Sequence, residues 1–184
     1  MDGSEVFWGE MAPCEHLVQI YADDCAFLDT LEGFVASGLF AGEGVVVIAT
    51  SAHLSLLNRR LLKRGSSIAR AMDSDQYLAL DAEAMLSMFM SNGWPDEELF
   101  NNFVTGILSR AKKGGRRVRA FGEMVAILWA QGNSGATVRL EHLWQELCEE
   151  QQFVLFCAYP KCGFTRETSE SIKDICDKHS RVIA

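Results

Sequence analysis

The sequence predicts a single three-layer α/β domain, in which helices cover both faces of a parallel sheet. Three observations lead to this prediction. Short apolar segments typical of strands alternate with longer segments whose apolar residues recur at helical spacing. The segment Gly44–Thr50 is continuously apolar and rich in β-branched residues, as expected for a strand buried on both faces. The length of 184 residues suits one domain, which we expect over residues 15–184 after a flexible leader at 1–14.

The first strand is expected at 16–21, where HLVQIY is short and apolar. Asp23 or Asp24 is a good N-cap for the helix that follows, because a carboxylate accepts hydrogen bonds from free backbone N–H groups. Gly42 suits the position just after the helix end, where the backbone commonly adopts a positive φ. The second strand then covers 44–50.

The next helix is expected to begin with Ser51 as a possible cap and to end near Gly65. The segment QYLALD at 76–81 predicts a third strand. It runs into a helix over 82–90, whose sequence is AEAMLSMFM.

A turn is predicted at 92–94 (NGW), followed by a helix with Pro95 at its first position. Two glycines at 114–115 end that helix. The fourth strand is predicted at 116–122, and a helix from Glu123 to about Ala130 follows it.

The last third of the chain is predicted to contain a helix around Leu140–Leu147 and a fifth strand at 153–160 (FVLFCAYP). A polar final helix is expected at about 169–179. The composition is that of a globular protein, since 48% of the residues are hydrophobic and 23% are charged.

Charge and hydropathy exclude several classes of protein. The formal net charge of −8 argues against a general phosphate-backbone binder, so we expect no direct nucleic-acid binding. The basic run 112–119 is explained by a helix end and the start of a strand. No segment approaches the roughly 20 apolar residues that cross a bilayer, and the N-terminus lacks a signal-peptide pattern. We therefore expect a cytoplasmic protein without membrane contact.

The cysteines predict neither a metal site nor a cofactor. The six cysteines include no CxxC pair. Cys157 and Cys162 are spaced C-x4-C, but no second pair with zinc-ligand spacing accompanies them. We therefore expect reduced cysteines that act as small apolar side chains.

Candidate ligand-binding residues follow from the fold prediction, because parallel sheets bind ligands beyond the carboxyl ends of their strands. These candidates are Tyr21, Asp23, Asp24, Thr50, Ser51, His53, Phe121, Gly122, Glu123 and Tyr159. For His53 a local polar cap is the competing interpretation. For the aromatic residues it is ordinary core packing.

Glu123 is a lone carboxylate in the apolar run VRAFGEMVAILW. A charge in such surroundings costs free energy unless it is compensated. Three roles remain open from the sequence. It stabilises the first turn of its own helix, pairs with Arg119, or contacts a ligand.

No catalytic motif is present. The first strand-to-helix turn reads YADDCAF, where a phosphate-binding loop would lie, and its two aspartates would repel a phosphate. The sequence contains no GxxxxGK[ST], GxSxG or HExxH pattern. We therefore expect a non-enzyme. An alternative is a degenerate nucleotide-binding protein related to ATPases, with Glu123 orienting water or a metal ion. A third possibility is an interaction or homo-oligomerisation module.

Several segments carry a family resemblance. These are HLVQIYADDC and its continuation at 16–50, FGEMVAILWAQGN at 121–133, RLEHLWQEL at 139–147, LFCAYP at 155–160 and ICDKHSRV at 175–182. Together they resemble the MEDS family, named for a methanogen and methylotroph DcmR-type sensory domain. The resemblance extends over about 16–182.

The resemblance implies a sensory domain of RecA/KaiC-like fold that lacks the P-loop. It implies a small hydrocarbon derivative as ligand, and a histidine kinase or transcription regulator as partner. By position, Tyr21, Asp24, the segment 122–124, His179 and Ser180 match the motifs of the family. The chain contains no helix-turn-helix and no kinase region, so we expect its signal to pass through a partner or through oligomerisation.

Overall fold

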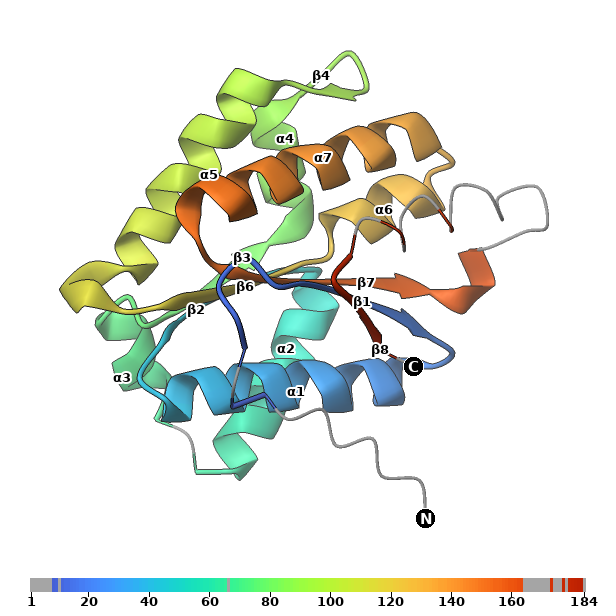
Figure 1. The fold of residues 1–184 in the computed structure, drawn as a ribbon. Helices are drawn as coiled ribbons and strands as arrows, with labels where there is room; N and C mark the ends of the chain where they lie inside the picture. The colour runs from blue at the N-terminus through green and yellow to red at the C-terminus, as the bar shows by residue number, and fades with distance from the viewer. Residues whose placement is uncertain are drawn as a thin grey trace.

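The fold was analysed in a computed structural model that describes residues 8–9, 11–65, 67–163, 173, 177 and 179–183. A six-stranded sheet with the order β3-β2-β6-β7-β1-β8 forms the middle layer (Figure 1). Its strands are β1 His16–Tyr21, β2 Gly44–Ala49, β3 Tyr77–Asp81, β6 Val118–Gly122, β7 Val154–Pro160 and β8 Arg181–Ile183. Every neighbouring pair is parallel, which confirms the predicted sheet.

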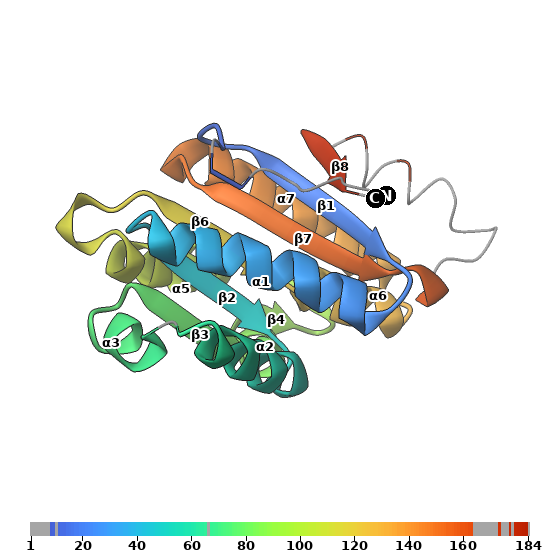
Figure 2. The same cartoon turned by 90° about the horizontal axis from the view of Figure 1, so that it is seen from below.

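Helices cover both faces of the sheet, so the predicted three-layer arrangement is also confirmed. One face carries α1 Asp24–Phe40, α2 Ser51–Lys63 and α3 Ile68–Asp73 (Figure 2). The other carries α4 Ala82–Phe89, α5 Glu97–Ala111, α6 Met124–Ala130 and α7 Ser134–Gln151 (Figure 1). Short 3-10 turns lie at Lys113–Gly115 and Lys161–Gly163. Among the described residues, no helix combines the length and apolar character that crossing a membrane requires.

Strand β2 shows why its sequence is apolar at every position. Val45 and Val47 belong to the core beneath α1 and α2. Val46 and Ile48, which point the other way, belong to the core beneath α4–α7. Because successive side chains of a strand face opposite sides, a strand covered on both faces has no polar side.

Two of the predicted helix ends are confirmed. Asp23 caps α1, since its carboxylate accepts a hydrogen bond of 2.9 Å from the backbone N–H of Ala26. Gly42, with φ +75°, follows the last residues of α1 as predicted. For α2, however, Thr50 is the cap and Ser51 is the first helical residue. Thr50 has extended backbone angles and its hydroxyl accepts from the N–H of His53, which explains the shift by one residue.

The prediction of Pro95 as a first helical residue is wrong. Pro95 lies in strand β5 (Trp94–Pro95), which pairs with β4 (Met90–Ser91) in a small antiparallel hairpin. Asn92 and Gly93 form its turn and both have positive φ, as a two-residue hairpin turn requires. Asp96 then caps α5 by accepting from the N–H of Leu99 at 2.9 Å.

Three further elements differ from the sequence prediction. Helix α3 and strand β8 were not expected, because both are short and lack a clear apolar period. The fourth strand begins at Val118, two residues later than predicted. The helix expected at 169–179 falls largely outside the described residues.

Arg119 is a buried charge on β6 and does not pair with Glu123. Its side chain forms an ion pair with Glu43 and donates a hydrogen bond of 2.9 Å to the carbonyl oxygen of Phe34. Both partners lie beside the amino end of β6, whereas Glu123 follows its carboxyl end. Gly38 of α1 makes room for the guanidinium, since a Cβ there would lie 2.6 Å from Cδ and Nε of Arg119.

Gly44, at the start of β2, gives a test of this packing. A Cβ at Gly44 would lie 2.3 Å from the carbonyl oxygen of Ala111. Because that oxygen belongs to the backbone, we expect Gly44→Ala to lower the free energy of unfolding by about 2–3 kcal/mol. Urea denaturation measures this change.

The matched control is Gly106→Ala in α5, where an added Cβ meets no atom within 4 Å. There we expect a gain of about 0.5–1 kcal/mol, because alanine favours helix. Equal stability changes for both variants would contradict the close approach of β2 and α5.

Candidate functional site

The carboxylate of Glu123 joins two strand-to-helix junctions at the carboxyl edge of the sheet. Its Oε2 accepts a hydrogen bond of 2.8 Å from the backbone N–H of Thr50, and its Oε1 lies 2.7 Å from Nδ1 of His53. Its own N–H donates to the carbonyl oxygen of Ile48 at 2.8 Å. Glu123 therefore ties the junction of β6 and α6 to the junction of β2 and α2.

This arrangement answers the question of which helix Glu123 stabilises. Glu123 occupies the N-cap position of α6, but its side chain makes no capping bond there. The carboxylate instead lies against the N-terminus of α2, through Thr50 and His53. A helix N-terminus carries a partial positive charge, so a carboxylate is favoured at that position.

His53 and Glu123 are both largely buried, with 14% and 7% of their side-chain surface exposed. The hydrogen bond to Glu123 raises the pKa of His53, while burial opposes this rise. The negative charges of Glu123 and Asp24 raise it further. The pair therefore consists of a carboxylate and an imidazole whose pKa lies above the ordinary value for histidine.

Aromatic side chains pack beside this pair. The ring of Phe27 stands edge-on to His53 at 5.0 Å and stacks on Tyr21 at 4.7 Å. Phe121 packs behind Phe27, with a centroid distance of 5.6 Å. Burial, together with the charges of Glu123 and Asp24, raises the pKa of Tyr21, so its hydroxyl stays protonated. An apolar wall with one hydroxyl therefore borders the charged pair.

The structure brings five of the predicted residues together: Tyr21, Asp24, Thr50, His53 and Glu123. Phe121 lies beneath them and is fully buried. Phe27 belongs to the same group but was missed in the sequence, because it fits the apolar stripe of α1.

The other predicted residues lie apart. Asp23 is engaged as the α1 cap. Ser51 donates a hydrogen bond to Asp81 at the end of β3. Gly122 faces α7, since a Cβ there would contact Trp144 at 3.5 Å. Tyr159 also points to the α7 side, where its hydroxyl donates to Glu141.

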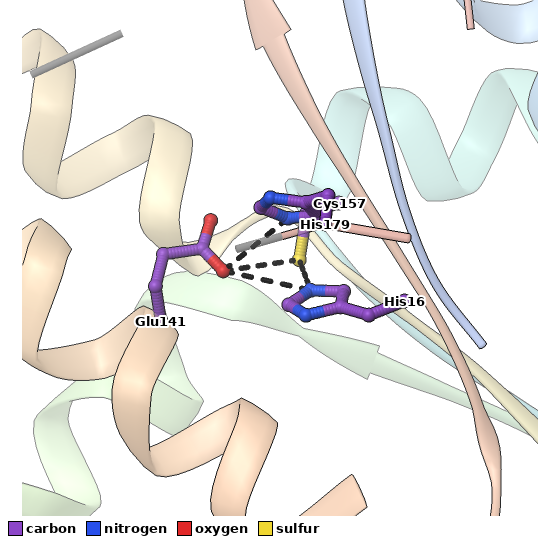
Figure 3. Close-up of side chains that lie close together, drawn as sticks. All are labelled: His16, Glu141, Cys157 and His179. Atoms are coloured by element: carbon purple, nitrogen blue, oxygen red, sulfur yellow. Dashed lines mark hydrogen bonds and ion pairs between the residues drawn. The ribbon is translucent and has the colours of Figure 1, made fainter. Parts of the chain in front are cut away.

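A second polar cluster surrounds Tyr159 on that opposite face. His16, Glu141, Cys157 and His179 converge there and are all buried (Figure 3). Burial and the nearby His179 lower the pKa of His16 to about 3, and burial with Glu141 raises the pKa of the Cys157 thiol. No spacing pattern in the sequence predicts this cluster, because successive members lie 125, 16 and 22 positions apart.

A hollow on the described surface forms a third region. It is an open groove of about 1360 Å³ beside α1 and α3, near the amino ends of β3 and β6. Arg64, Arg70 and Arg116 line it together with Phe40. None of the predicted ligand-binding residues lines this groove. The groove therefore serves as a reference region for testing the carboxyl-edge site.

The raised pKa of His53 gives a direct test of its pairing with Glu123. We expect the His53 ring to titrate above 6.5, the ordinary value, when followed by NMR. In Glu123→Gln the titration should move back toward that value, because the amide carries no charge.

The same pair predicts how stability varies with pH. A raised folded-state pKa means that the contribution of the pair is complete below pH 6.5 and fades as pH rises through the folded pKa of His53. The stability difference between the protein and Glu123→Gln should narrow accordingly in denaturation at increasing pH. A His53 titration unchanged in the variant would contradict the pairing.

Comparison with known proteins identifies a family for this chain. A search of curated proteins found none that matches the chain. The family model described as "MEthanogen/methylotroph, DcmR Sensory domain" (MEDS) matches residues 15–180. This match includes every residue of the carboxyl-edge site and of the cluster around Glu141. The chain therefore belongs to the MEDS family of sensory domains.

Proposed function

We propose that this sensory domain binds a small molecule at the carboxyl edge of its sheet, around His53 and Glu123, and does not act as an enzyme. A protein partner would then read the bound state. The observation that carries this proposal is the shared carboxylate of Glu123, which bonds both Thr50 N–H and His53. It places a buried charged pair where parallel sheets bind ligands.

The chemistry of the site favours a small organic molecule with one polar group. Nδ1 of His53 faces Glu123, so Nε2 is the ring nitrogen available to a hydrogen-bond acceptor. The ring of Tyr21, which is 7% exposed, borders the same pair and favours a short apolar chain. Small hydrocarbon derivatives, the ligands implied by the family resemblance, fit this combination.

The connections of Glu123 suggest how such a ligand would produce a signal. A ligand group that competes for His53 weakens the bond between α2 and the β6–α6 junction. The N-terminus of α2 would then lose part of its link to β6. A population shift requires that the ligand bind one arrangement better than the other, and this contact differs between them.

A nucleotide-hydrolysing role receives less support. The carboxylate of Asp23 caps α1, the helix that follows β1, and so occupies the place of a phosphate. Both oxygens of Glu123 already accept hydrogen bonds, which leaves it poorly placed to orient water. The relation to RecA/KaiC-like ATPases stays a prediction from the resemblance.

The output is proposed to pass to a signalling protein, such as a histidine kinase or transcription regulator, or to a second copy of the chain. Helix α2 is the element whose contacts would change. Its outer side includes Leu56 and Leu62, which are 38% and 61% exposed. A partner that packs on α2 would therefore respond when the hydrogen bond between His53 and Glu123 is broken.

Ligand binding is tested by NMR with three probe classes: short alcohols, alkylamines and haloalkanes. We expect at least one class to shift the backbone amide of Thr50, because its N–H bonds directly to Glu123. His53→Ala should abolish the shift, while calorimetry with ATP and Mg²⁺ should show no binding.

Arg70→Ala is the matched control, because Arg70 lines the separate groove. Probe binding should survive in this variant. Binding lost in Arg70→Ala but kept in His53→Ala would move the site to the groove. Micromolar ATP binding would favour the nucleotide-binding alternative.

A further inference from the structure

The cluster on the α7 side of the sheet has the composition of a metal site. His16 belongs to β1, Cys157 to β7, Glu141 to α7, and His179 precedes β8 (Figure 3). They supply two imidazoles, one thiol and one carboxylate, and the four ligand atoms lie within 4.8 Å of one another. Each residue is at most 8% exposed, and Cys157 is fully buried.

Four of the six distances between ligand atoms in the cluster are close to those of ligands around one ion. Oε2 of Glu141 lies 3.5 Å from Nε2 of His16, 3.6 Å from Nε2 of His179 and 3.9 Å from Sγ of Cys157. Nε2 of His16 lies 3.5 Å from the same sulfur. With zinc–ligand bonds of about 2.0–2.3 Å, a tetrahedron has edges of about 3.3–3.8 Å.

Direct hydrogen bonding explains these distances less well. An N–H···O hydrogen bond spans about 2.7–3.2 Å, whereas the two imidazole–carboxylate separations are 3.5 and 3.6 Å. A thiol is also a weak donor. The imidazole nitrogens and the carboxylate oxygen therefore converge at separations longer than an N–H···O hydrogen bond.

The orientation of His16 is fixed for metal binding. The amide of Gln145 donates through Nε2 to Glu149 at 2.6 Å, so its oxygen Oε1 faces His16. That oxygen lies 2.8 Å from Nδ1 of His16 and requires a proton there. Nε2 of His16 then presents a lone pair to the cluster. Second-shell bonds of this kind hold histidine ligands of metals in one tautomer.

Two other contacts position the remaining ligands. The hydroxyl of Tyr159 donates to Oε1 of Glu141, which leaves Oε2 directed at the cluster. Ser180 bonds His16 three times: its N–H and hydroxyl donate to the carbonyl oxygen, and its hydroxyl accepts from the N–H. These bonds hold the adjacent His179 against His16, with ring centroids 3.9 Å apart.

We propose that His16, Glu141, Cys157 and His179 bind one Zn²⁺ ion in a closed tetrahedral site. The mixed nitrogen, sulfur and oxygen donors suit zinc, and four protein ligands leave no position for a substrate. Zinc replaces the thiol proton of Cys157, which passes to solvent. The ion would fasten His179, two residues before β8, to the centre of the sheet. This inference does not depend on ligand binding at His53.

Cobalt substitution tests the site. The full chain is stripped with a chelator and titrated with CoCl₂. We expect one equivalent to bind, with intense visible bands of tetrahedral cobalt and a sulfur-to-cobalt charge-transfer band in the near ultraviolet. ZnCl₂ should displace the cobalt and raise the melting temperature. Cys157→Ser should lose the charge-transfer band.

Cys148→Ser is the matched control, because Cys148 is also fully buried but its thiol donates to the carbonyl oxygen of Phe153. The cobalt spectrum should persist in this variant. Absence of cobalt binding, or a charge-transfer band retained in Cys157→Ser, would overturn the proposal.

X-ray absorption of the zinc-loaded unmodified chain keeps the test independent of whether Cys157→Ser folds. We expect one sulfur at about 2.3 Å and three nitrogen or oxygen atoms at about 2.0–2.1 Å. Two or more sulfur atoms, or six light atoms, would reject these four ligands. Selective loading with Fe²⁺ over Zn²⁺ would also reject the zinc assignment.

Discussion

Burial of both faces of the parallel sheet decides where charge lies in this molecule. A strand covered on both sides has no solvated face, so a polar side chain on it must find a partner inside the protein. Arg119 meets this requirement with Glu43 and the carbonyl oxygen of Phe34. Gln19 meets it only through its amide nitrogen, which donates to Thr30 at 2.9 Å, while its buried amide oxygen has no hydrogen-bond partner among the described residues. Glu123 lies at the carboxyl edge, and His16, Glu141 and His179 lie in one enclosed cluster.

The two polar sites lie on opposite sides of the sheet but share its strands. Strand β1 carries His16 at its start and Tyr21 at its end, and these residues belong to different sites. Cys157 of β7 is the register partner of Gly122, the residue before Glu123. A change at either proposed site therefore acts on backbone hydrogen-bonded to the other.

Much of the fold was predictable from local pattern. Five strands and the main helices follow from apolar periodicity, and Asp23 and Gly42 mark the ends of α1 because capping is a local interaction. Pro95 was misplaced because proline suits both a helix start and an edge strand. Only pairing with Met90 selects the strand. Strand β8 has three residues and exists through its pairing with β1, which no local pattern encodes.

Apolar periodicity was enough to predict a parallel α/β fold with polar residues at the carboxyl ends of its strands, and the sequence contains no P-loop motif. The same sequence left Glu123 between three roles. Tertiary packing shows that its carboxylate bonds Thr50 and His53 of another junction, whereas Arg119 pairs with Glu43. It also brought together His16, Glu141, Cys157 and His179. Periodicity and capping act within a few residues of the chain, so they could not select these partners. Strand order, by contrast, sets which distant side chains meet.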